Sequence, residues 1–424
     1  MIDWRMSYSD LRAAQQPALA RQLSRVWDRS EFYREIWKKP PSESSFGELP
    51  LVTKQDFHEA LQSGFLGSNL SCAPEDLVHI HTSSGTSGRP TYFGLTARDY
   101  AAWMKIFTRG FQLAGIRPGD RVLQGFAMSR GYAGGVPMIE AFESMGCVAL
   151  PVGAEAGSVR LVDAIRQLLP NVLYASPSMA RRLAGVYRDE VGRSAADSSV
   201  RLLLTGGEPG AGDPESKRAL GDMWGAEVRE CGGGTDVSPL MVVECEAHDG
   251  LHFVAGDEVL IEVINPIDSS LASLTGRAEG EIVYTHLARE ANPVVRMRHG
   301  DLVELSTEPC RCGMHAPRLW FRGRSDDMLI VKGVKIFPSN IQAVVSEFAP
   351  DLSGAFTIRR PNLDDAAGLL RVVCESVRVA DPDLKGNFER RARDRIGVRI
   401  ECELVPLGTL GADQAQKGKW LTDD

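Results

Sequence analysis

A run rich in hydroxyl groups and glycines carries the clearest chemistry in this sequence: His81-Thr82-Ser83-Ser84-Gly85-Thr86-Ser87-Gly88-Arg89-Pro90-Thr91. It lies between two expected strands, residues 77–81 and 91–95. Backbone N–H groups and hydroxyls in such a loop can converge on one anion, and its glycines permit close approach and positive φ. The run therefore predicts a phosphate site and makes ATP the first candidate ligand. The residues expected around the phosphates are Ser83, Ser84, Gly85, Thr86, Ser87 and Gly88.

Two features of this run limit the prediction. A Walker loop would have Gly-Lys-Ser/Thr at this spacing, whereas Arg89-Pro90 stands there. A plain Ser/Gly-rich surface loop has a similar composition, so the run alone leaves both interpretations open.

A second glycine-rich turn, Gly206-Gly207-Glu208-Pro209, directly follows the apolar segment 202–204. Open α/β sheets bind ligands at the carboxyl ends of their strands. The turn is thus a candidate nucleotide contact, and an ordinary strand-to-helix turn is the alternative.

The segments that must position these loops alternate between helix and strand patterns. This alternation predicts an α/β fold with a mainly parallel sheet and helices on its faces. The expected helices are residues 96–114, 134–145, 159–168 and 178–186, and the expected strands are 121–126, 147–152, 172–175 and 200–205. Upstream, residues 11–37 predict two short amphipathic helices, and Thr53 is a candidate N-cap for a helix through Phe57 and Leu61.

The pattern changes after residue 240. Short strands at 241–245, 259–264, 281–284 and 302–305 predict an antiparallel or barrel-like subdomain over about residues 240–323. From residue 326 the order strand, helix, strand, strand, helix, strand predicts a small α+β, ferredoxin-like domain, with helices at 338–347 and 382–396. The expected domains are residues 1–323 and 324–424.

Composition narrows the class of function. The chain has 424 residues, 43% of them hydrophobic, and a formal charge of −8, which argues against nucleic acid as the main partner. It contains no apolar run long enough to span a bilayer, and its first residues do not resemble a signal peptide. We therefore expect a cytoplasmic protein, with no membrane partner, that is a monomer or a homodimer.

The order of motifs resembles a phenylacetate–coenzyme A ligase-like member of the adenylate-forming enzymes, the group that includes acyl-CoA synthetases, luciferases and peptide-synthetase adenylation domains. The resemblance runs nearly end to end. It is most specific at Gly323-Arg324-Ser325-Asp326-Asp327-Met328-Leu329-Ile330 and Gly333-Val334-Lys335-Ile336-Phe337-Pro338. It also includes the runs at 30–34, 49–54, 81–91 and 206–209.

The resemblance implies a role for several residues. Asp301 accepts hydrogen bonds from the ribose hydroxyls and Arg324 assists, although Gly300-Asp301 is also a common turn pair. The turn Gly206-Gly207-Glu208-Pro209 contacts the adenine. Thr235 contacts the α-phosphate, and Asp236 replaces the usual glutamate that holds Mg²⁺.

The run Cys231-Gly232-Gly233-Gly234-Thr235-Asp236 departs from the family pattern, Tyr-Gly-x-Ser/Thr-Glu. The aromatic residue that packs on the adenine is absent, and the metal-binding carboxylate is one methylene shorter. Nucleotide preference and metal position are the two properties that these departures affect.

The resemblance also implies a mobile C-terminal domain with Asp326 as its hinge. A lysine near the C-terminus bridges the substrate carboxylate and the α-phosphate in the family. Lys419 is the candidate here and Lys417 the reserve, against an ordinary solvated tail lysine.

The loop Met128-Ser129-Arg130-Gly131-Tyr132-Ala133-Gly134-Gly135 aligns with the family's acid pocket. Tyr132, Ala133 and Gly134 are the expected substrate contacts, with Tyr132 able to stack on an aromatic ring. Arg130 either pairs with a polar substituent or points to solvent.

A zinc site is the remaining expectation. Cys245, His252, Cys310 and Cys312 supply three thiolates and one imidazole, enough for a closed tetrahedral structural site, and the family often carries this set. His248 and His315 are competing ligands. Buried thiols beside an unrelated histidine are the alternative.

Together these features predict an AMP-forming acid–CoA ligase that uses ATP, Mg²⁺ and coenzyme A to activate an aromatic or aryl-acetic acid. One alternative is an adenylate-forming enzyme of secondary metabolism that passes the acyl group to an amine, a carrier-protein thiol or another nucleophile. A catalytically reduced nucleotide-binding protein is the other.

Overall fold

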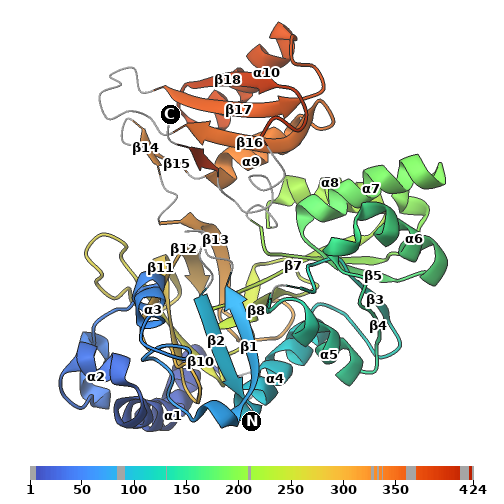
Figure 1. Cartoon of the computed structure of the whole chain (residues 1–424). Helices are drawn as coiled ribbons and strands as arrows, with labels where there is room; N and C mark the ends of the chain where they lie inside the picture. The colour runs from blue at the N-terminus through green and yellow to red at the C-terminus, as the bar shows by residue number, and fades with distance from the viewer. Residues whose placement is uncertain are drawn as a thin grey trace. The chain divides into compact units, whose positions relative to one another are not determined.

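The computed structural model describes residues 6–83, 91–129, 131–208, 212–325, 329–331, 334–336, 338–359, 369–410 and 420–422 (Figure 1). The chain divides into two compact units, residues 1–207 with 220–320, and residues 208–219 with 321–424. The functional boundary predicted between residues 323 and 324 stays a prediction, and the expected hinge, Asp326, lies outside the described residues.

The first unit is built on a mixed sheet of eleven strands, in the order β10-β11-β12-β13-β9-β8-β7-β6-β5-β3-β4. Its parallel half confirms the predicted parallel sheet and consists of β4 (Val148–Leu150), β3 (Arg121–Gln124), β5 (Val172–Ala175), β6 (Leu202–Thr205) and β7 (Glu227–Gly234).

The four strands predicted to form a barrel-like subdomain lie in the antiparallel half of the same sheet, as β8 (Ser238–Glu244), β10 (Val259–Ile264), β11 (Arg277–His286) and β12 (Met297–Ser306). This half also contains β9 (Leu251–Phe253) and β13 (Arg318–Arg324), which were not predicted. The two halves join where β7, parallel to β6, turns back as β8, so the sheet changes direction at Thr235 and Asp236.

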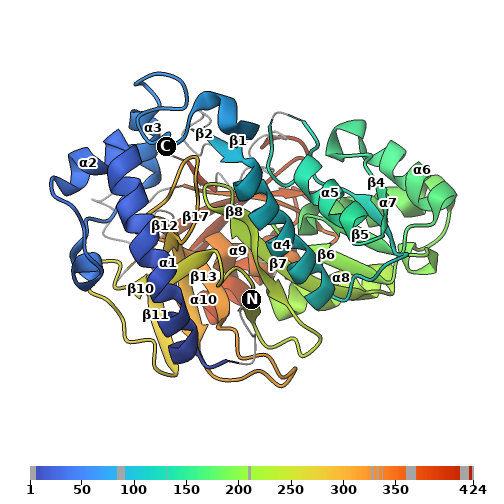
Figure 2. The same ribbon diagram turned by 90° about the horizontal axis from the view of Figure 1, so that it is seen from below.

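Helices cover both faces of the parallel strands because successive apolar side chains point to opposite faces. Val122, Leu202 and Leu204 share one core with α1 (Tyr8–Arg29), α4 (Ala97–Leu113) and α5 (Val136–Ser144). Leu123 and Leu203 share another with α6 (Ser158–Leu168), α7 (Pro177–Val191) and α8 (Pro214–Trp224). Figure 2 shows α4 beside the parallel strands and α1 in front of the antiparallel strands β10 to β12.

Between α1 and α4 the chain forms α2 (Glu31–Trp37), α3 (Lys54–Ala60) and an antiparallel hairpin of β1 (Leu77–Ser83) and β2 (Thr91–Thr96). Thr53 caps α3 as predicted, in a capping box with Asp56. The hydroxyl-rich run connects the two hairpin strands, and its residues 84–90 lie outside the described part of the chain.

The second unit contains a four-stranded sheet in the order β18-β17-β16-β19, packed against α9 (Pro338–Glu347) and α10 (Pro382–Ile396). Both helices have the predicted bounds. The strands are β16 (Leu352–Arg359), β17 (Leu370–Ser376), β18 (Ile400–Val405) and β19 (Leu421–Thr422). The segment expected to supply the first strand instead forms a separate pair, β14 (Leu329–Val331) with β15 (Val334–Ile336).

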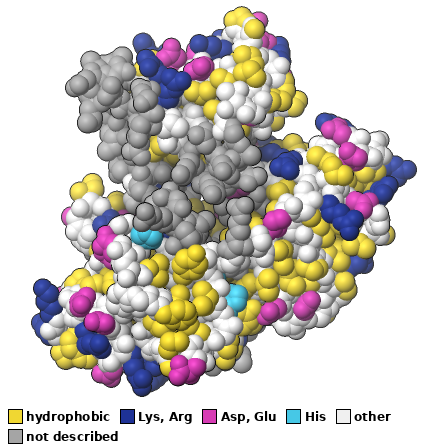
Figure 3. Space-filling model, in the orientation of Figure 1, with side chains coloured by type: hydrophobic (Ala, Val, Ile, Leu, Met, Phe, Trp, Pro, Cys, Tyr) yellow, Lys and Arg dark blue, Asp and Glu magenta, His cyan; other side chains and the backbone are white. Residues whose placement is uncertain are grey.

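Basic and acidic side chains are interspersed over the surface of each unit in Figure 3. Within the described residues, no helix combines the length and the apolar character needed to cross a bilayer.

Asp99, in the first turn of α4, holds the helix to the segment that follows β11. Its carboxylate accepts hydrogen bonds from the backbone N–H groups of Glu290 at 2.8 Å and Ala291 at 3.0 Å, and lies 3.6 Å from the buried guanidinium of Arg289. Replacing Asp99 by alanine would leave buried donors and a buried charge without their acceptor.

We therefore expect Asp99→Ala to lower the free energy of unfolding by about 3 kcal/mol, measured by urea denaturation. Asp163→Ala, which removes an exposed carboxylate from α6, is the matched control and should leave the denaturation midpoint almost unchanged. Equal losses in the two variants would contradict this account of Asp99.

Candidate active site

The glycine-rich turn at residues 206–209 and the glycine-rich run at residues 231–236 lie side by side. Gly206 follows β6 and Cys231 lies in the neighbouring parallel strand β7. A Cβ atom on Gly206 would lie 2.1 Å from the carbonyl oxygen of Cys231, so only glycine permits this approach. Gly207 has φ of +77°, which also favours glycine. The turn thus presents its backbone at the carboxyl edge of the sheet, and Pro209 lies outside the described residues.

The glycines before Thr235 are required by close packing. A Cβ atom on Gly233 would lie 2.4 Å from the carbonyl oxygen of Ser238, and one on Gly234 would lie 2.2 Å from Nε2 of His299. Cys231, at the start of the run, is buried, and burial raises the pKa of its thiol well above its ordinary value. Cys231 is therefore a neutral packing group rather than a thiolate nucleophile.

His81 connects the hydroxyl-rich hairpin to Thr235. Its Nε2 atom lies 2.9 Å from the carbonyl oxygen of Thr235, and because a carbonyl only accepts, the imidazole donates Nε2–H. The ring is fully buried against Phe93 and Trp103. Burial lowers the pKa of His81 to about 3, so the ring is neutral. The strand that leads to the predicted phosphate loop is thus fixed beside Thr235, whose predicted contact with the α-phosphate stays a prediction.

Asp236, the predicted Mg²⁺ ligand, is a buried carboxylate with an incomplete set of partners. Its Oδ2 atom lies 3.2 Å from the ammonium of Lys54, whereas its buried Oδ1 atom has no hydrogen-bond partner among the described residues. Mg²⁺ prefers oxygen ligands and is usually held by one or two carboxylates. The unpaired buried oxygen therefore fits a cation ligand.

Lys54 was part of a motif in the sequence, but its connection to Asp236 was not predicted. The segment before it runs beside β12: the N–H of Val52 donates to the Arg296 carbonyl at 3.0 Å, and the Arg298 N–H donates to the Val52 carbonyl at 2.8 Å. Lys54 then begins α3. A lysine directly after a helix cap is an ordinary surface feature, so the sequence offered no signal for this contact.

His299 and Asp301, both in β12, extend the polar group. His299 Nδ1 lies 2.6 Å from Oδ2 of Asp301, and its Nε2 lies 3.9 Å from Oδ2 of Asp236. Lys54, Asp236, His299 and Asp301 thus form one connected set, although only the two carboxylates were predicted. Arg324, the last residue of β13, belongs to the second unit, and its predicted role beside Asp301 stays a prediction.

The predicted acid-pocket loop lies beside the same hairpin. Thr82 of β1 forms a bridge with Tyr132, and its N–H donates to the Gly131 carbonyl at 2.8 Å. The Tyr132 ring covers Gly134, where a Cβ atom would lie 2.6 Å from the ring, and Ala133 is fully buried.

Aromatic side chains connect this loop to the adenine turn. The centroid of the Phe126 ring lies 6.4 Å from that of Tyr132 and 4.6 Å from that of Tyr174. A Cβ atom on Gly207 would lie 3.3 Å from the Phe126 ring. Arg130 lies outside the described residues. The expected acid contacts and the expected adenine turn are therefore neighbours.

The four predicted zinc ligands lie together in the antiparallel half of the sheet. Cys245, His252, Cys310 and Cys312 have ligand atoms within 4.8 Å of one another. The Sγ atoms of Cys245 and Cys310 are 3.8 Å apart, and Cys312 Sγ lies 3.4 Å from His252 Nε2. A tetrahedron with Zn–S bonds of about 2.3 Å has S–S edges of about 3.8 Å, so this geometry fits zinc. Among the described residues, His248 and His315 are not part of the group.

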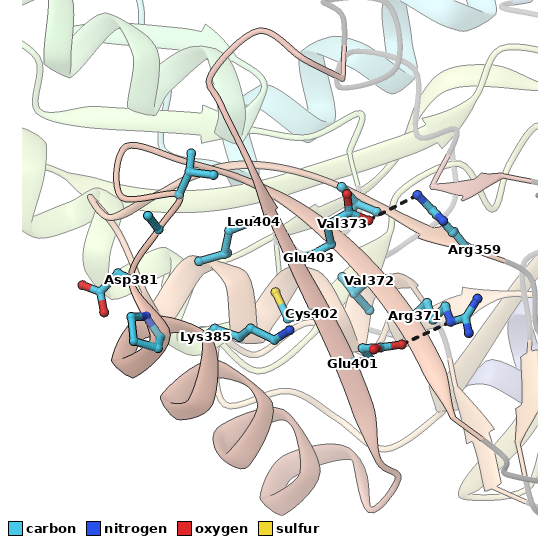
Figure 4. Close-up of a pocket in the computed structure, with 13 residues that line it drawn as sticks. Arg359, Arg371, Val372, Val373, Asp381, Lys385, Glu401, Cys402, Glu403 and Leu404 are labelled. Atoms are coloured by element: carbon cyan, nitrogen blue, oxygen red, sulfur yellow. Dashed lines mark hydrogen bonds and ion pairs between the residues drawn. The ribbon is translucent and has the colours of Figure 1, made fainter.

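The second unit has a pocket at β17, β18 and the start of α10, shown in Figure 4. Four of its charged residues form two pairs, Arg359 with Glu403 and Arg371 with Glu401, both at 3.2 Å. None of the predicted site residues lines this pocket.

Comparison with known proteins identifies the family. Residues 11–283 match the model of the AMP-binding enzymes, described as "AMP-binding enzyme". This protein belongs to that family.

Curated relatives include a phenylacetate-coenzyme A ligase of Thermus thermophilus, 28% identical over 96% of this chain and 95% of the relative. A phenylacetate-coenzyme A ligase of Pseudomonas putida is 28% identical over 95% of this chain and 92% of the relative. Among solved structures, 2-hydroxyisobutyryl-CoA ligase in the postadenylation state with 2-HIB-AMP has a TM-score of 0.87 and 28% identity, and the match covers 99% of this chain and 90% of that chain.

The buried neutral state of His81 predicts a specific dependence of stability on pH. The pKa of His81 in the folded protein, about 3, lies below the ordinary value of 6.5, so between these values the unfolded chain binds a proton that the folded protein does not. The folded state therefore loses stability as the pH falls below about 6.5.

His81→Gln keeps an N–H donor for Thr235 but cannot titrate. We expect the wild type to lose about 2 kcal/mol more than this variant between pH 7 and pH 5, measured by urea denaturation at both values. The same acid-induced loss in both proteins would show that His81 is not buried in its neutral form.

Proposed function

We propose that this protein is an AMP-forming acid–CoA ligase that activates an aromatic or aryl-acetic carboxylate. The observation that carries the proposal is the convergence at the carboxyl edge of the sheet. Three segments meet there: the Gly206 turn, the Thr235–Asp236 segment and the hairpin held by His81. The chain that contains them belongs to the AMP-binding enzymes. Open α/β sheets bind nucleotides at this edge.

In the first half-reaction the substrate carboxylate attacks the α-phosphorus of ATP, forming the acyl-adenylate as the bond to pyrophosphate breaks. Thr235 contacts the α-phosphate, and residues 83–88 hold the other phosphates. Asp301 accepts hydrogen bonds from the ribose hydroxyls. Asp236 would hold Mg²⁺, which neutralises phosphate charge when bound. Positioning and charge neutralisation account for most of the rate.

In the second half-reaction the thiol of coenzyme A attacks the acyl carbonyl, loses its proton and releases AMP. The roles of Lys419 as the cation of adenylation, Arg324 as a ribose contact and Asp326 as the hinge come from the resemblance and stay predictions. Residues 411–419, which include Lys419 and Lys417, lie outside the described part of the chain.

The substrate class follows from the surroundings of the adenine turn. Phe126, Tyr132 and Tyr174 form an aromatic cluster directly beside Gly207, and such side chains stack on planar rings. Curated relatives that share this family are named for phenylacetate and for 3-hydroxybenzoate, the latter in Aromatoleum at 24% identity. Both names support an aryl carboxylate as the substrate.

A screen for pyrophosphate release over benzoic, phenylacetic, cinnamic and heteroaromatic acids, each with and without coenzyme A, tests the function. We expect acid-dependent release that coenzyme A accelerates. Lys419→Ala should lower acid-dependent exchange of labelled pyrophosphate into ATP by about 100-fold or more, with Lys417→Ala as the matched control.

The other outcomes separate the alternatives. Release that needs an acid but is indifferent to coenzyme A would favour another acyl acceptor. No exchange with any acid would favour a nucleotide-binding protein without catalysis. A normal rate in Lys419→Ala with a lowered rate in Lys417→Ala would assign the catalytic cation to Lys417.

We further propose that Cys245, His252, Cys310 and Cys312 bind one structural zinc ion. Four ligands leave no open position, so the ion would join β9 and the ends of β8 and β12 without taking part in the reaction. Burial lowers the pKa of His252 to about 4, which keeps its imidazole neutral, the form that binds metals.

Elemental analysis of the purified protein should find one zinc per chain, lost in Cys310→Ser and retained in Cys147→Ser, which replaces a buried cysteine outside the group. We expect Cys310→Ser to lower the thermal midpoint more than the control does, because metal-binding energy contributes to folding. A zinc content that does not change in Cys310→Ser would refute the site. The cytoplasmic location and the choice between monomer and homodimer stay predictions.

A further inference from the structure

Gly234, which takes the variable position of the family pattern, has a structural partner in His299. The imidazole occupies the space in which a side chain at residue 234 would lie, since a Cβ atom there would be 2.2 Å from His299 Nε2. Gly234 and His299 therefore depend on each other: the ring fits only because residue 234 has no side chain. The space beside residue 234 is therefore filled by a side chain of β12.

The ring of His299 is held from three sides. Its Nδ1 atom lies 2.6 Å from Oδ2 of Asp301, and only a tenth of the side chain is exposed, 11%. Tyr284 contacts it edge-on, with ring centroids 5.4 Å apart and an interplanar angle of 81°. Gly234 lies on the Nε2 side. Because its own orientation is fixed in this way, the imidazole can fix the orientation of the Asp301 carboxylate, to which it donates a hydrogen bond.

We infer that His299 is a positioning residue that orients the Asp301 carboxylate toward the ribose of the bound nucleotide. Because a carboxylate only accepts hydrogen bonds, Nδ1–H of His299 donates to Oδ2 of Asp301. This short, charge-assisted bond restricts rotation of the carboxylate, so its lone pairs keep one direction. The inference rests on the proposed function, which assigns the ribose hydroxyls to Asp301.

The position of His299 also connects the two ends of the nucleotide site. Its Nε2 atom is 3.9 Å from Oδ2 of Asp236, the proposed Mg²⁺ ligand, and Asp236 contacts Lys54. The carboxylate proposed for the ribose and the carboxylate proposed for the metal thus lie beside one ring. Displacing the ring would disturb ribose recognition first, because Asp301 is within hydrogen-bond distance of it and Asp236 is not.

The test is a comparison of two nucleotides by isothermal titration calorimetry with Mg²⁺ present and without any acid. ATP is compared with 2′,3′-dideoxyadenosine triphosphate, which lacks both ribose hydroxyls. Wild-type protein should bind ATP about tenfold or more tightly than the dideoxy nucleotide, as expected for hydrogen bonds to a charged acceptor. His299→Phe keeps the ring but not the donor, and should bring this ratio to within about twofold of one.

His299→Asn is the conservative variant, because its side-chain amide nitrogen replaces Nδ1 as a donor. It should keep most of the preference for ATP. Gly234→Ala should act like His299→Phe, because it displaces the ring without changing it. Far-ultraviolet circular dichroism and thermal midpoints show that each variant is folded.

A purely structural role for His299 gives a different result. If His299→Phe weakens both nucleotides by the same factor and keeps the wild-type ratio, or if His299→Asn loses the preference as completely as His299→Phe, the inference is wrong. A wild type that binds both nucleotides equally overturns the inference together with the ribose role of Asp301. Pyrophosphate exchange by the wild type, measured separately, then shows whether the enzymatic function itself stands.

Discussion

The site depends on one hydrogen bond, from the imidazole of His81 to the backbone carbonyl of Thr235. The two residues are 154 positions apart in the chain, and their contact at 2.9 Å joins the hydroxyl-rich hairpin to the turn between β7 and β8. Phe93 and Trp103 exclude water from the ring, and this burial keeps the imidazole neutral. Without it, nothing else described in the site holds β1 directly to Thr235.

Glycine is the second constraint. At Gly206, Gly233 and Gly234 a side chain would collide with a carbonyl or a ring, so the glycines bring backbone segments together rather than loosen the chain. The short distances that result place Asp236 and Asp301 on either side of His299. One carboxylate paired with a lysine and a second paired with a histidine suit a site that holds a metal cation and a sugar hydroxyl, which is what nucleotide activation requires.

Local sequence patterns predicted most of the fold. The alternation of strands and helices between residues 96 and 205, the cap at Thr53 and both helices of the second unit depend on periodicity and capping within a few residues, and the structure confirms them. Motif order predicted Thr235 and Asp236, and the zinc candidates lie together as expected. β7, β9 and β13 were not predicted, and β19 was missed because its two residues, Leu421–Thr422, are too short to show a strand period.

The sequence could not predict contacts between residues far apart in the chain when their local sequence gives no sign of a distant partner. Lys54 follows a helix cap, His81 lies within a strand, and His299 precedes a turn-like Gly-Asp pair. Each has a common role in proteins that needs no partner elsewhere. Only the fold brings Lys54 to Asp236, His81 to Thr235 and His299 to Gly234. The reason for a glycine at residue 234 could therefore not be found without β12 in place.

The central claim is that Mg·ATP binds where the carboxyl ends of β6 and β7 meet the His81 hairpin. Hydrogen–deuterium exchange of the backbone amides, with and without saturating Mg·ATP, tests it most directly. We expect slower exchange on nucleotide addition at residues 206–208 and 233–237, and also along residues 82–91. Unchanged exchange in all three segments, with protection appearing elsewhere in the chain, would contradict it.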